Sequence, residues 1–269
     1  MSLQPEPNQM TIADTRIEHV VGSIAIEKQS KKERLLAYAR REMSDIRQFI
    51  AKPVRRFSTR STPREKWTRL AFLFSLGLLI DAVYLLSIGL ALDSWTSLEN
   101  TLDMTGIFGI FLVIAGGPLI EELIFRAGLR SIIYSIFIGP VLICLMLGAW
   151  QISIGFCIFG ICIAMLMEYS VSAKNKLLDG AKKSNYGRLF IQHYPKVFWL
   201  YAASFAIVHI QNFSFSDATG LLVIFAVIPQ FVAGILWGYV RLRDGLMSSV
   251  VLHSLNNLFA VLMVALLGN

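Results

Sequence analysis

Six long apolar runs follow one another along the chain after residue 69, separated by short polar segments. They cover residues 70–92, 104–120, 131–167, 197–216, 218–240 and 245–269. A run of about 20 apolar residues is long enough to cross a bilayer as a helix. The run at 131–167 would form a helix about 56 Å long, against a hydrocarbon core of about 30 Å, so we expect it to reverse near Trp150. The pattern predicts an all-α polytopic transmembrane bundle of seven to eight spans over residues 70–269.

A different pattern precedes these runs. Residues 1–30 show no sustained period, and we expect them to be flexible. Over residues 31–52, apolar side chains recur every three or four positions among arginines, at Leu35, Ala39, Met43, Ile46 and Ile50. This spacing is typical of an amphipathic helix, and a basic amphipathic helix binds a membrane surface. Residues 1–69 are therefore predicted to form a basic arm that carries this helix.

Composition and charge favour a membrane protein over a soluble one. The mean hydropathy is +0.59 and charged residues make up 16%, against about 25% in a typical soluble domain. Residues 1–69 hold 15 Lys and Arg against 8 Asp and Glu, so they carry the whole net charge of +7. Positive charge beside a span marks the cytoplasmic side and attracts anionic lipid headgroups. We therefore expect lipid, and no nucleic acid, as the partner of this charge.

The same rule orients the loops. The basic segments 174–196 and 241–244 are expected to be cytoplasmic, on the same side as the arm, and the acidic segment 93–103 is expected to lie outside. We read 174–188 as a solvated loop. These assignments predict an integral membrane protein with a cytoplasmic N-terminus, and we expect its membrane to be that of a prokaryotic cell.

Charged residues inside an apolar run need a reason, because each costs roughly 2.5–3.5 kcal/mol on insertion scales. The stretch GGPLIEELIFRAGLR contains Glu121, Glu122 and Arg126. Gly-Gly-Pro at 116–118 is expected to interrupt one helix and to begin the next, which places both glutamates near a positive helix end. Glu122 and Arg126 have the spacing and order of an ion pair, and this leaves Glu121 free to act as a base. A purely structural Glu–Arg pair explains the same residues.

Two histidines lie in the middle of apolar runs, and each has a partner four residues away. Phe205 precedes His209, and Asn257 follows His253. Residues four apart share a helical face. His253 and Asn257 can supply two hydrogen-bond donors to a developing oxyanion. Hydrogen bonds that pack helices together are the alternative reading of each pair.

Together these residues have the parts needed to hydrolyse an amide. A water held between Glu121 and His209 would face donors on His253 and Asn257. This glutamate mechanism requires no cofactor, although the same carboxylate and imidazoles are also ligands for a divalent metal such as zinc. The chain has no H-E-x-x-H segment, which excludes a zincin, and no G-x-S-x-G segment.

The motifs resemble those of the CPBP family, which includes type II CAAX prenyl endopeptidases and bacteriocin-processing, Abi-like proteins. Its motifs E-E-x-x-x-R, F-x-x-x-H and H-x-x-x-N occur here in order, beginning at Glu121, Phe205 and His253. The resemblance covers about 104–268. It implies an intramembrane endopeptidase in which Glu121 and His209 activate the water, His253 and Asn257 bind the oxyanion, and three residues support the site, namely Glu122, Arg126 and Phe205.

Several functions remain open at this point. The favoured one is hydrolysis of peptide bonds in membrane-associated substrates, with prenylated CAAX-type peptides as one class. A non-catalytic scaffold, immunity or peptide-binding protein is the alternative, and a proton-coupled transporter is a third reading. No residue selects a substrate or settles whether a metal binds.

Other polar, small and aromatic residues are interpreted structurally. Asp81 is expected to pair with Arg130 or to stay protonated, and Gly234 with Gly238 should let two helices approach closely. Four aromatic residues are read as members of an interfacial belt, namely Trp67, Trp199, Trp237 and Tyr239.

Overall fold

The computed structural model describes most of the chain after residue 30. The described residues are 31–55, 57, 61–89, 99–100, 106–173, 176–214 and 222–267. The segment 1–30, expected to be flexible, and nearly all of the expected outer loop 93–103 lie outside them. The chain divides into residues 1–47 and 48–269. Helix α2 (Lys31–Ala51) covers the expected amphipathic segment, and the second unit contains every other described element.

The described part of the second unit is helical apart from one short strand pair. Its α-helices are α3 (Pro63–Tyr84), α5 (Gly106–Phe111), α6 (Gly117–Phe125), α7 (Gly139–Met146), α8 (Trp150–Ala173), α9 (Lys176–Val208), α10 (Leu222–Ala226), α11 (Ile228–Arg243) and α12 (Leu246–Leu267). Three π-helices and two 3₁₀ helices connect them, namely η1 (Leu85–Gly89), η2 (Leu112–Gly116), η4 (Tyr134–Ile138), η3 (Gly128–Arg130) and η5 (His209–Asn212). Strands β1 (Glu99–Asn100) and β2 (Phe213–Ser214) pair antiparallel, with Glu99 opposite Ser214.

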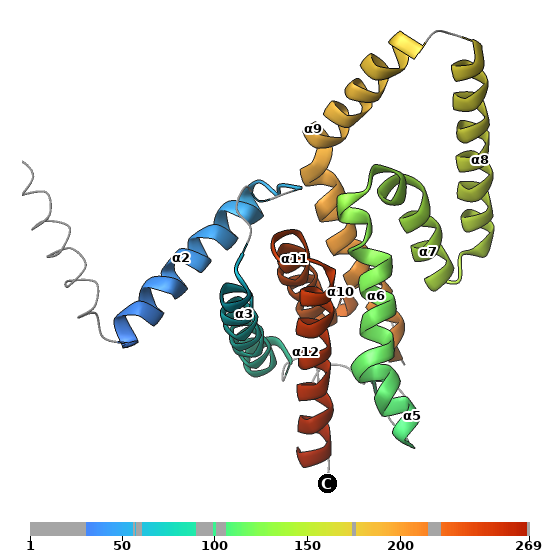
Figure 1. Ribbon diagram of the computed structural model, residues 1–269. Coiled ribbons are helices and arrows are strands. Elements are labelled where there is room, and N and C mark those ends of the chain that lie inside the picture. The colour runs from blue at the N-terminus through green and yellow to red at the C-terminus, as the bar shows by residue number, and fades with distance from the viewer. Residues whose placement is uncertain are drawn as a thin grey trace, which may run out of the picture. The chain divides into compact units, whose positions relative to one another are not determined.

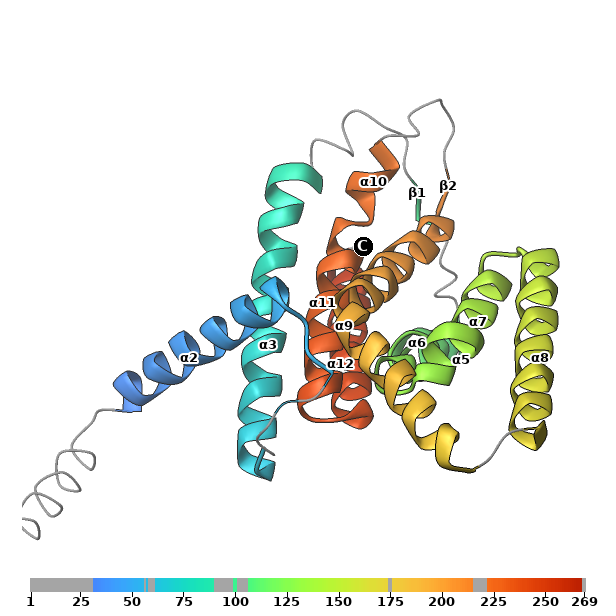
Figure 2. The same ribbon diagram turned by 90° about the horizontal axis from the view of Figure 1, so that it is seen from above.

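Helix α12 holds a central place in this unit (Figure 1). It packs against α3 and α6, and α11 packs against both α9 and α12. Helix α8 packs against α7 at one side of the bundle (Figure 2). The core lies between α6, α9, α11 and α12, where Phe125, Phe205, Tyr239 and Leu252 are almost fully buried. The polar side chains discussed below come from the same four helices and the turns beside them.

The start of α3 follows from its sequence. Thr62 precedes Pro63, which has the backbone angle of a first helical residue and needs no hydrogen bond there. The hydroxyl of Thr62 accepts from the Glu65 backbone N–H, and the Glu65 carboxylate accepts from the Thr62 backbone N–H at 2.7 Å. This capping box fixes the point at which the first long apolar helix begins.

The Gly-Gly-Pro segment does not break its helix, which differs from our expectation. Helices α5, η2 and α6 run on as one apolar stretch from Gly106 to Arg130. The chain passes the segment by a π turn, in which the Gly117 N–H bonds to the carbonyl of Leu112. A Cβ on Gly117 would lie 2.9 Å from that carbonyl oxygen, so the turn needs glycine. Since a preceding turn covers the first N–H groups of α6, Glu121 and Glu122 do not sit at a free helix end.

The long apolar run at 131–167 reverses, as its length predicts. Helix α7 ends at Met146 and α8 begins at Trp150. Gly148 lies between them with φ of 72°, a conformation that glycine adopts without strain. The prediction placed the reversal at Trp150, two residues after this glycine.

The prediction of a solvated loop at 174–188 is wrong, because the backbone is helical. Residues 176–208 form one helix, α9, which continues through Pro195. Lys, Leu, Ala and Arg are all good helix formers, so a charged segment can be helical without an apolar stripe of its own. Helix α9 therefore joins the charged segment directly to the apolar residues that lead to His209.

Glycines on α11 set its distance from α9, as the sequence predicts. A Cβ on Gly238 would lie 2.7 Å from Cε2 of Phe198, and one on Gly234 would lie 3.3 Å from the carbonyl oxygen of Ala202. Phe198 and Ala202 are both buried on α9. The small residues thus allow the close approach that places Phe205 against α11.

Three described helical stretches are long and apolar enough to cross a bilayer, namely Pro63–Ile88, Gly106–Arg130 and Leu246–Leu266. Many of their large apolar side chains point outward. Leu86 is 72% exposed, Ile107 is 89% exposed and Leu266 is 73% exposed. Apolar surface of this extent marks contact with lipid or with a partner. The total of seven to eight spans stays a prediction.

Candidate functional site

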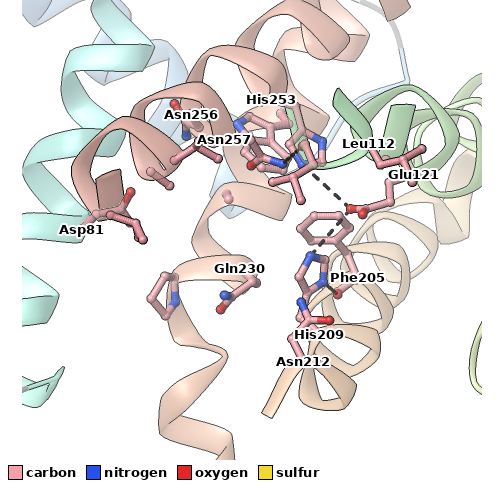
Figure 3. Close-up of a pocket in the computed structure, with 18 of the residues that line it drawn as sticks. Asp81, Leu112, Glu121, Phe205, His209, Asn212, Gln230, His253, Asn256 and Asn257 are labelled. Carbon is pink, nitrogen blue, oxygen red and sulfur yellow. Dashed lines mark hydrogen bonds and ion pairs between the residues drawn. The ribbon is translucent and has the colours of Figure 1, made fainter. Parts of the chain in front are cut away.

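A cavity of about 820 Å³ lies among α3, α5, η2, α6, α9, α11 and α12 (Figure 3). Glu121, His209, His253 and Asn257 all line it. These residues are up to 136 positions apart in the chain, and the packing of α12 against α6 and of α9 against α11 brings them together. The four residues singled out for chemistry therefore face one space.

Glu121 is the point at which the two histidines converge. Its Oε2 lies 3.6 Å from Nε2 of His209 and 3.8 Å from Nε2 of His253. Figure 3 shows the carboxylate between the two rings. Oε2 is buried and has no hydrogen-bond partner in the described part of the chain. Both distances are longer than that of a direct hydrogen bond. Oε2 therefore lacks a hydrogen bond, although two ring nitrogens lie nearby.

The backbone determines which nitrogen of His209 faces the carboxylate. Nδ1 lies 2.7 Å from the carbonyl oxygen of Phe205, one helical turn earlier. A carbonyl can only accept, so Nδ1 carries the proton. In the neutral ring, Nε2 then holds the free lone pair and can accept a proton. His209 thus presents a base toward Glu121.

Glu122 points away from the cavity and is fully buried. Its Oε1 lies 3.6 Å from Nε of Arg126, which is the predicted ion pair, and 3.2 Å from Nδ1 of His253. Its Oε2 accepts a hydrogen bond from Ser249 Oγ. Two adjacent glutamates therefore have different environments, since Glu122 is paired and Glu121 faces the cavity.

Aromatic rings hold the buried guanidinium of Arg126. Its Cζ lies 3.9 Å from the centroid of Phe205, and neither Nη atom has a hydrogen-bond partner in the described residues. The ring face attracts the charge and stands in for hydrogen bonds at that side. Phe205 also lies 4.5 Å from the ring of His209. The Phe of the F-x-x-x-H motif thus contacts both the charged pair and the histidine.

The end of α6 is held from the cytoplasmic segment predicted at 241–244. Nε of Arg241 donates to the carbonyl oxygen of Arg126 at 3.0 Å. Burial lowers the pKa of the Arg241 guanidinium. The same carbonyl also accepts from the backbone N–H of Leu129 at 3.3 Å, so Arg241 adds a second contact that helps to hold Arg126 in place.

Asn257 reaches a backbone carbonyl across the cavity wall. Its Nδ2 donates to the carbonyl oxygen of Val113 at 2.8 Å. In an α-helix that carbonyl would accept from Gly117, whose N–H instead bonds to Leu112. The next candidate donor is Pro118, which has no N–H. Asn257 therefore supplies the bond that the π turn removes, and its second N–H is left for the cavity.

Sequence reasoning missed Ser249 and misread Trp237. Ser249, His253 and Asn257 are spaced by four residues on α12, so their shared helical face was a usable signal. Trp237 is buried rather than interfacial, and its ring stacks on His253 with 3.7 Å between centroids. Tyr239, also read as interfacial, is fully buried. A single sequence does not reveal which side of a buried helix an aromatic residue faces.

Asp81 does not pair with Arg130, contrary to one of the two alternatives. Arg130 donates through Nη2 to the carbonyl oxygen of Leu242. Asp81 instead lines the cavity, from α3. Asn256 and Gln230 line it as well, and neither was singled out from the sequence. Gln230 is a lone polar residue in an apolar segment, and Asn256 lies one residue before Asn257, outside the H-x-x-x-N spacing.

No three His, Cys, Asp or Glu side chains within the described ranges are grouped in a way that would hold a metal ion. The residues that converge in the cavity therefore do not form a ready metal site. Proton transfer and hydrogen bonding are chemistry that these side chains can supply.

Comparison with known proteins places the chain in a family. The family model described as type II CAAX prenyl endopeptidase Rce1-like matches residues 103–259, which include all three motifs. No curated protein and no solved structure matches the chain. The match covers more than half of the 269 residues. The chain is therefore an integral membrane protein that belongs to the type II CAAX prenyl endopeptidase Rce1-like family.

Proposed function

We propose that this protein is an intramembrane endopeptidase that hydrolyses peptide bonds with a water activated by Glu121 and His209. One observation carries the proposal. Glu121 Oε2 is buried without a hydrogen-bond partner among the described residues, and it lies within 4 Å of Nε2 on both cavity histidines. A water between these atoms would satisfy the oxygen and would stand ready to react.

The first step is attack of this water on the substrate carbonyl carbon. Glu121 takes one proton of the water as the carbon–oxygen bond forms, and His209 Nε2 accepts a hydrogen bond from the other. The resulting tetrahedral intermediate carries a negative oxygen. Glu121 then gives its proton to the amide nitrogen, the carbon–nitrogen bond breaks, and an acid and an amine leave. Positioned proton transfer of this kind contributes about 100- to 10,000-fold in rate.

His253 and Asn257 stabilise the negative oxygen in this scheme. Nδ1 of His253 faces a carboxylate oxygen of Glu122, so that nitrogen carries a proton. His253 can then donate from Nε2 as an imidazolium. The negative charges of the two glutamates are then balanced by the positive charges of Arg126 and His253. The second N–H of Asn257 is the other donor.

Three residues support the arrangement without touching the reacting atoms. Glu122 orients His253, and Arg126 balances the charge of Glu122. Phe205 covers the guanidinium and, through its carbonyl, sets the proton on His209. No step in this mechanism requires a metal or another cofactor.

The proposal extends to substrate, location and the arm. The substrates are peptides or proteins in or at the membrane, with prenylated CAAX-type peptides as the first class to test, because the matching family is described by that activity. The protein resides in a prokaryotic cell membrane with its N-terminus in the cytoplasm. Residues 70–269 form the seven to eight spans, with the catalytic core at 104–268. The arm at 1–69 binds anionic headgroups through the helix near 31–52.

Cleavage of defined peptides tests the proposal. Full-length protein in detergent is incubated with matched membrane-anchored peptides, prenylated and unprenylated, and the products are identified by mass spectrometry. Wild type and Glu33→Gln, a control at an exposed position on α2, should cleave, and Glu121→Gln should not. Cleavage should survive a chelator. Folded wild type that leaves both peptide classes intact contradicts the proposal and favours a scaffold.

A further inference from the structure

A second polar group lines the cavity on the side away from the reaction centre. Figure 3 shows Asp81 across the cavity from Glu121, with Asn256 also on the far side from the carboxylate. Gln230 lines the same cavity from the first turn of α11. The proposed mechanism uses none of these three residues.

Two of these side chains have buried atoms without partners. Oδ1 of Asn256 and Oε1 of Gln230 are both inaccessible to solvent and accept no hydrogen bond within the part of the chain that is described. Leaving a buried polar atom unsatisfied is costly. Both residues line the cavity, so a ligand that enters it and turns either amide toward itself would supply the missing donor.

Asp81 adds charge to this group. It lies within the apolar stretch Pro63–Ile88, and no charged residue of the described chain pairs with it. An ionisable residue at such a position usually marks a substrate or ion pathway and has a counter-charge. Here the side chain faces the same cavity as a second carboxylate, Glu121.

Local packing places Asn256 close to Asp81. A Cβ on Gly77 would lie 3.5 Å from Nδ2 of Asn256, so the amide rests where α3 has no side chain. Asp81 is four residues after Gly77, on the same face of α3 and one turn farther along. The carboxylate and the amide therefore lie on neighbouring turns of the α3–α12 interface.

We propose that Asp81, Asn256 and Gln230 form a subsite that binds the basic side chain of a lysine or arginine in the peptide substrate. The inference rests on the proposed function, since it names a preference of the same cavity. An ammonium offers three donors and a guanidinium five, and neither accepts. They match a group made of a carboxylate and two amide oxygens.

The cavity also has apolar walls that suit such a residue. Phe108, Leu112, Val261 and Val264 line the cavity, and they can cover the aliphatic stem of a basic side chain while its charged head reaches the acceptors. An acidic substrate residue at this position would face Asp81 and be rejected. The subsite thus selects by charge, at a distance from the bond that is cut.

Binding is measured separately from cleavage. Glu121→Gln protein in detergent is mixed with a peptide library in which each position holds either lysine or norleucine, which has a similar length and no charge. Bound peptides are recovered and counted by mass spectrometry. Lysine at one position should be enriched about tenfold or more over norleucine. The enrichment should fall to about one when Asp81→Asn is added, and Asn256→Leu should reduce it as well.

A matched variant and a parallel assay separate the possible failures. Ser75→Ala, at an exposed position on the same helix, should keep the enrichment. Equal recovery of lysine and norleucine peptides, unchanged by Asp81→Asn, or no recovery at all, overturns the subsite. Wild type is tested for cleavage of the same library. Cleavage without lysine enrichment supports the proposed endopeptidase and contradicts the subsite. Lysine enrichment without cleavage supports the subsite and contradicts the proposed endopeptidase.

Discussion

His209 donates from Nδ1 to the carbonyl oxygen of Phe205, with 2.7 Å between the two atoms. This bond joins the first and last residues of the F-x-x-x-H motif, and it directs the free lone pair of the ring toward Glu121. The side chain of Phe205 meanwhile covers Arg126. The motif therefore serves two purposes, since its backbone sets a proton position and its ring holds a buried charge.

The two adjacent glutamates should behave in opposite ways when each is changed to glutamine. Glu122→Gln removes a fully buried charge that contacts Arg126, His253 and Ser249, so we expect the free energy of unfolding to fall by about 3–5 kcal/mol. Glu121→Gln alters an oxygen that has no hydrogen-bond partner in the described structure and should cost less than about 1 kcal/mol. Denaturant titration in detergent measures both. Equal losses would contradict the assignment of one structural and one chemical glutamate.

Asn257 should affect both stability and rate. Asn257→Ala leaves the carbonyl of Val113 without a donor, which should lower the free energy of unfolding by about 1–3 kcal/mol. It also removes one donor to the oxyanion, which should slow cleavage by about 100- to 1,000-fold. Asn256→Ala is the stability control, because Oδ1 of that residue has no partner within the described residues. An Asn257→Ala protein of unchanged stability would mean that the Val113 contact contributes nothing.

Gly238→Ala should loosen the contact between α9 and α11. The added Cβ would lie 2.7 Å from a buried phenylalanine ring, Phe198, and overpacking of this kind costs about 1–3 kcal/mol. Gly187→Ala on α9 is the matched control, since nothing lies within 4 Å of its Cβ position. Thermal unfolding in detergent should show a lower Tm for Gly238→Ala alone. A Tm equal to that of wild type would show that the helices can separate without cost.

The ion pair between Arg69 and Asp244 is buried, so breaking it should lower the free energy of unfolding. Nη1 of Arg69 donates to both carboxylate oxygens, at 2.8 and 2.7 Å, and the two side chains are 4% and 0% exposed. Asp244→Ala should lower the free energy of unfolding by about 3–5 kcal/mol, because it leaves a buried guanidinium. Changing both residues to apolar ones of similar size should recover most of that loss. A double variant no more stable than Asp244→Ala would contradict this reason.

Sequence patterns predicted the features that depend on local spacing. The Glu122–Arg126 pair, the small residues at 234 and 238, and the reversal before α8 all follow from residues near one another in the chain. Three of the six apolar runs likewise coincide with helices that are long enough to span a bilayer. Each of these depends on helical periodicity or on a distance along one segment.

Features that depend on contacts between distant segments were not predictable. Ser249 meets Glu122 only because α12 packs on α6, and Trp237 is buried because α11 lies between α9 and α12. The π turn before Pro118 was missed as well, since its stability depends on a donor from Asn257. Asn256 and Gln230 face the cavity because of how α12 and α11 are rotated about their own axes. The spacing rules fix which residues share a face, and tertiary packing decides what that face meets.

In the proposed mechanism, Glu121 and His209 act on one water. The most direct measurement compares cleavage rates of Glu121→Gln, His209→Gln and the double variant on one substrate, with folding of each verified by thermal unfolding. If both residues serve the same water, each single change should reduce the rate about 100- to 10,000-fold, and the double variant should be no slower than the worse single one. Losses that multiply in the double variant, or cleavage that persists in Glu121→Gln, would contradict the shared water.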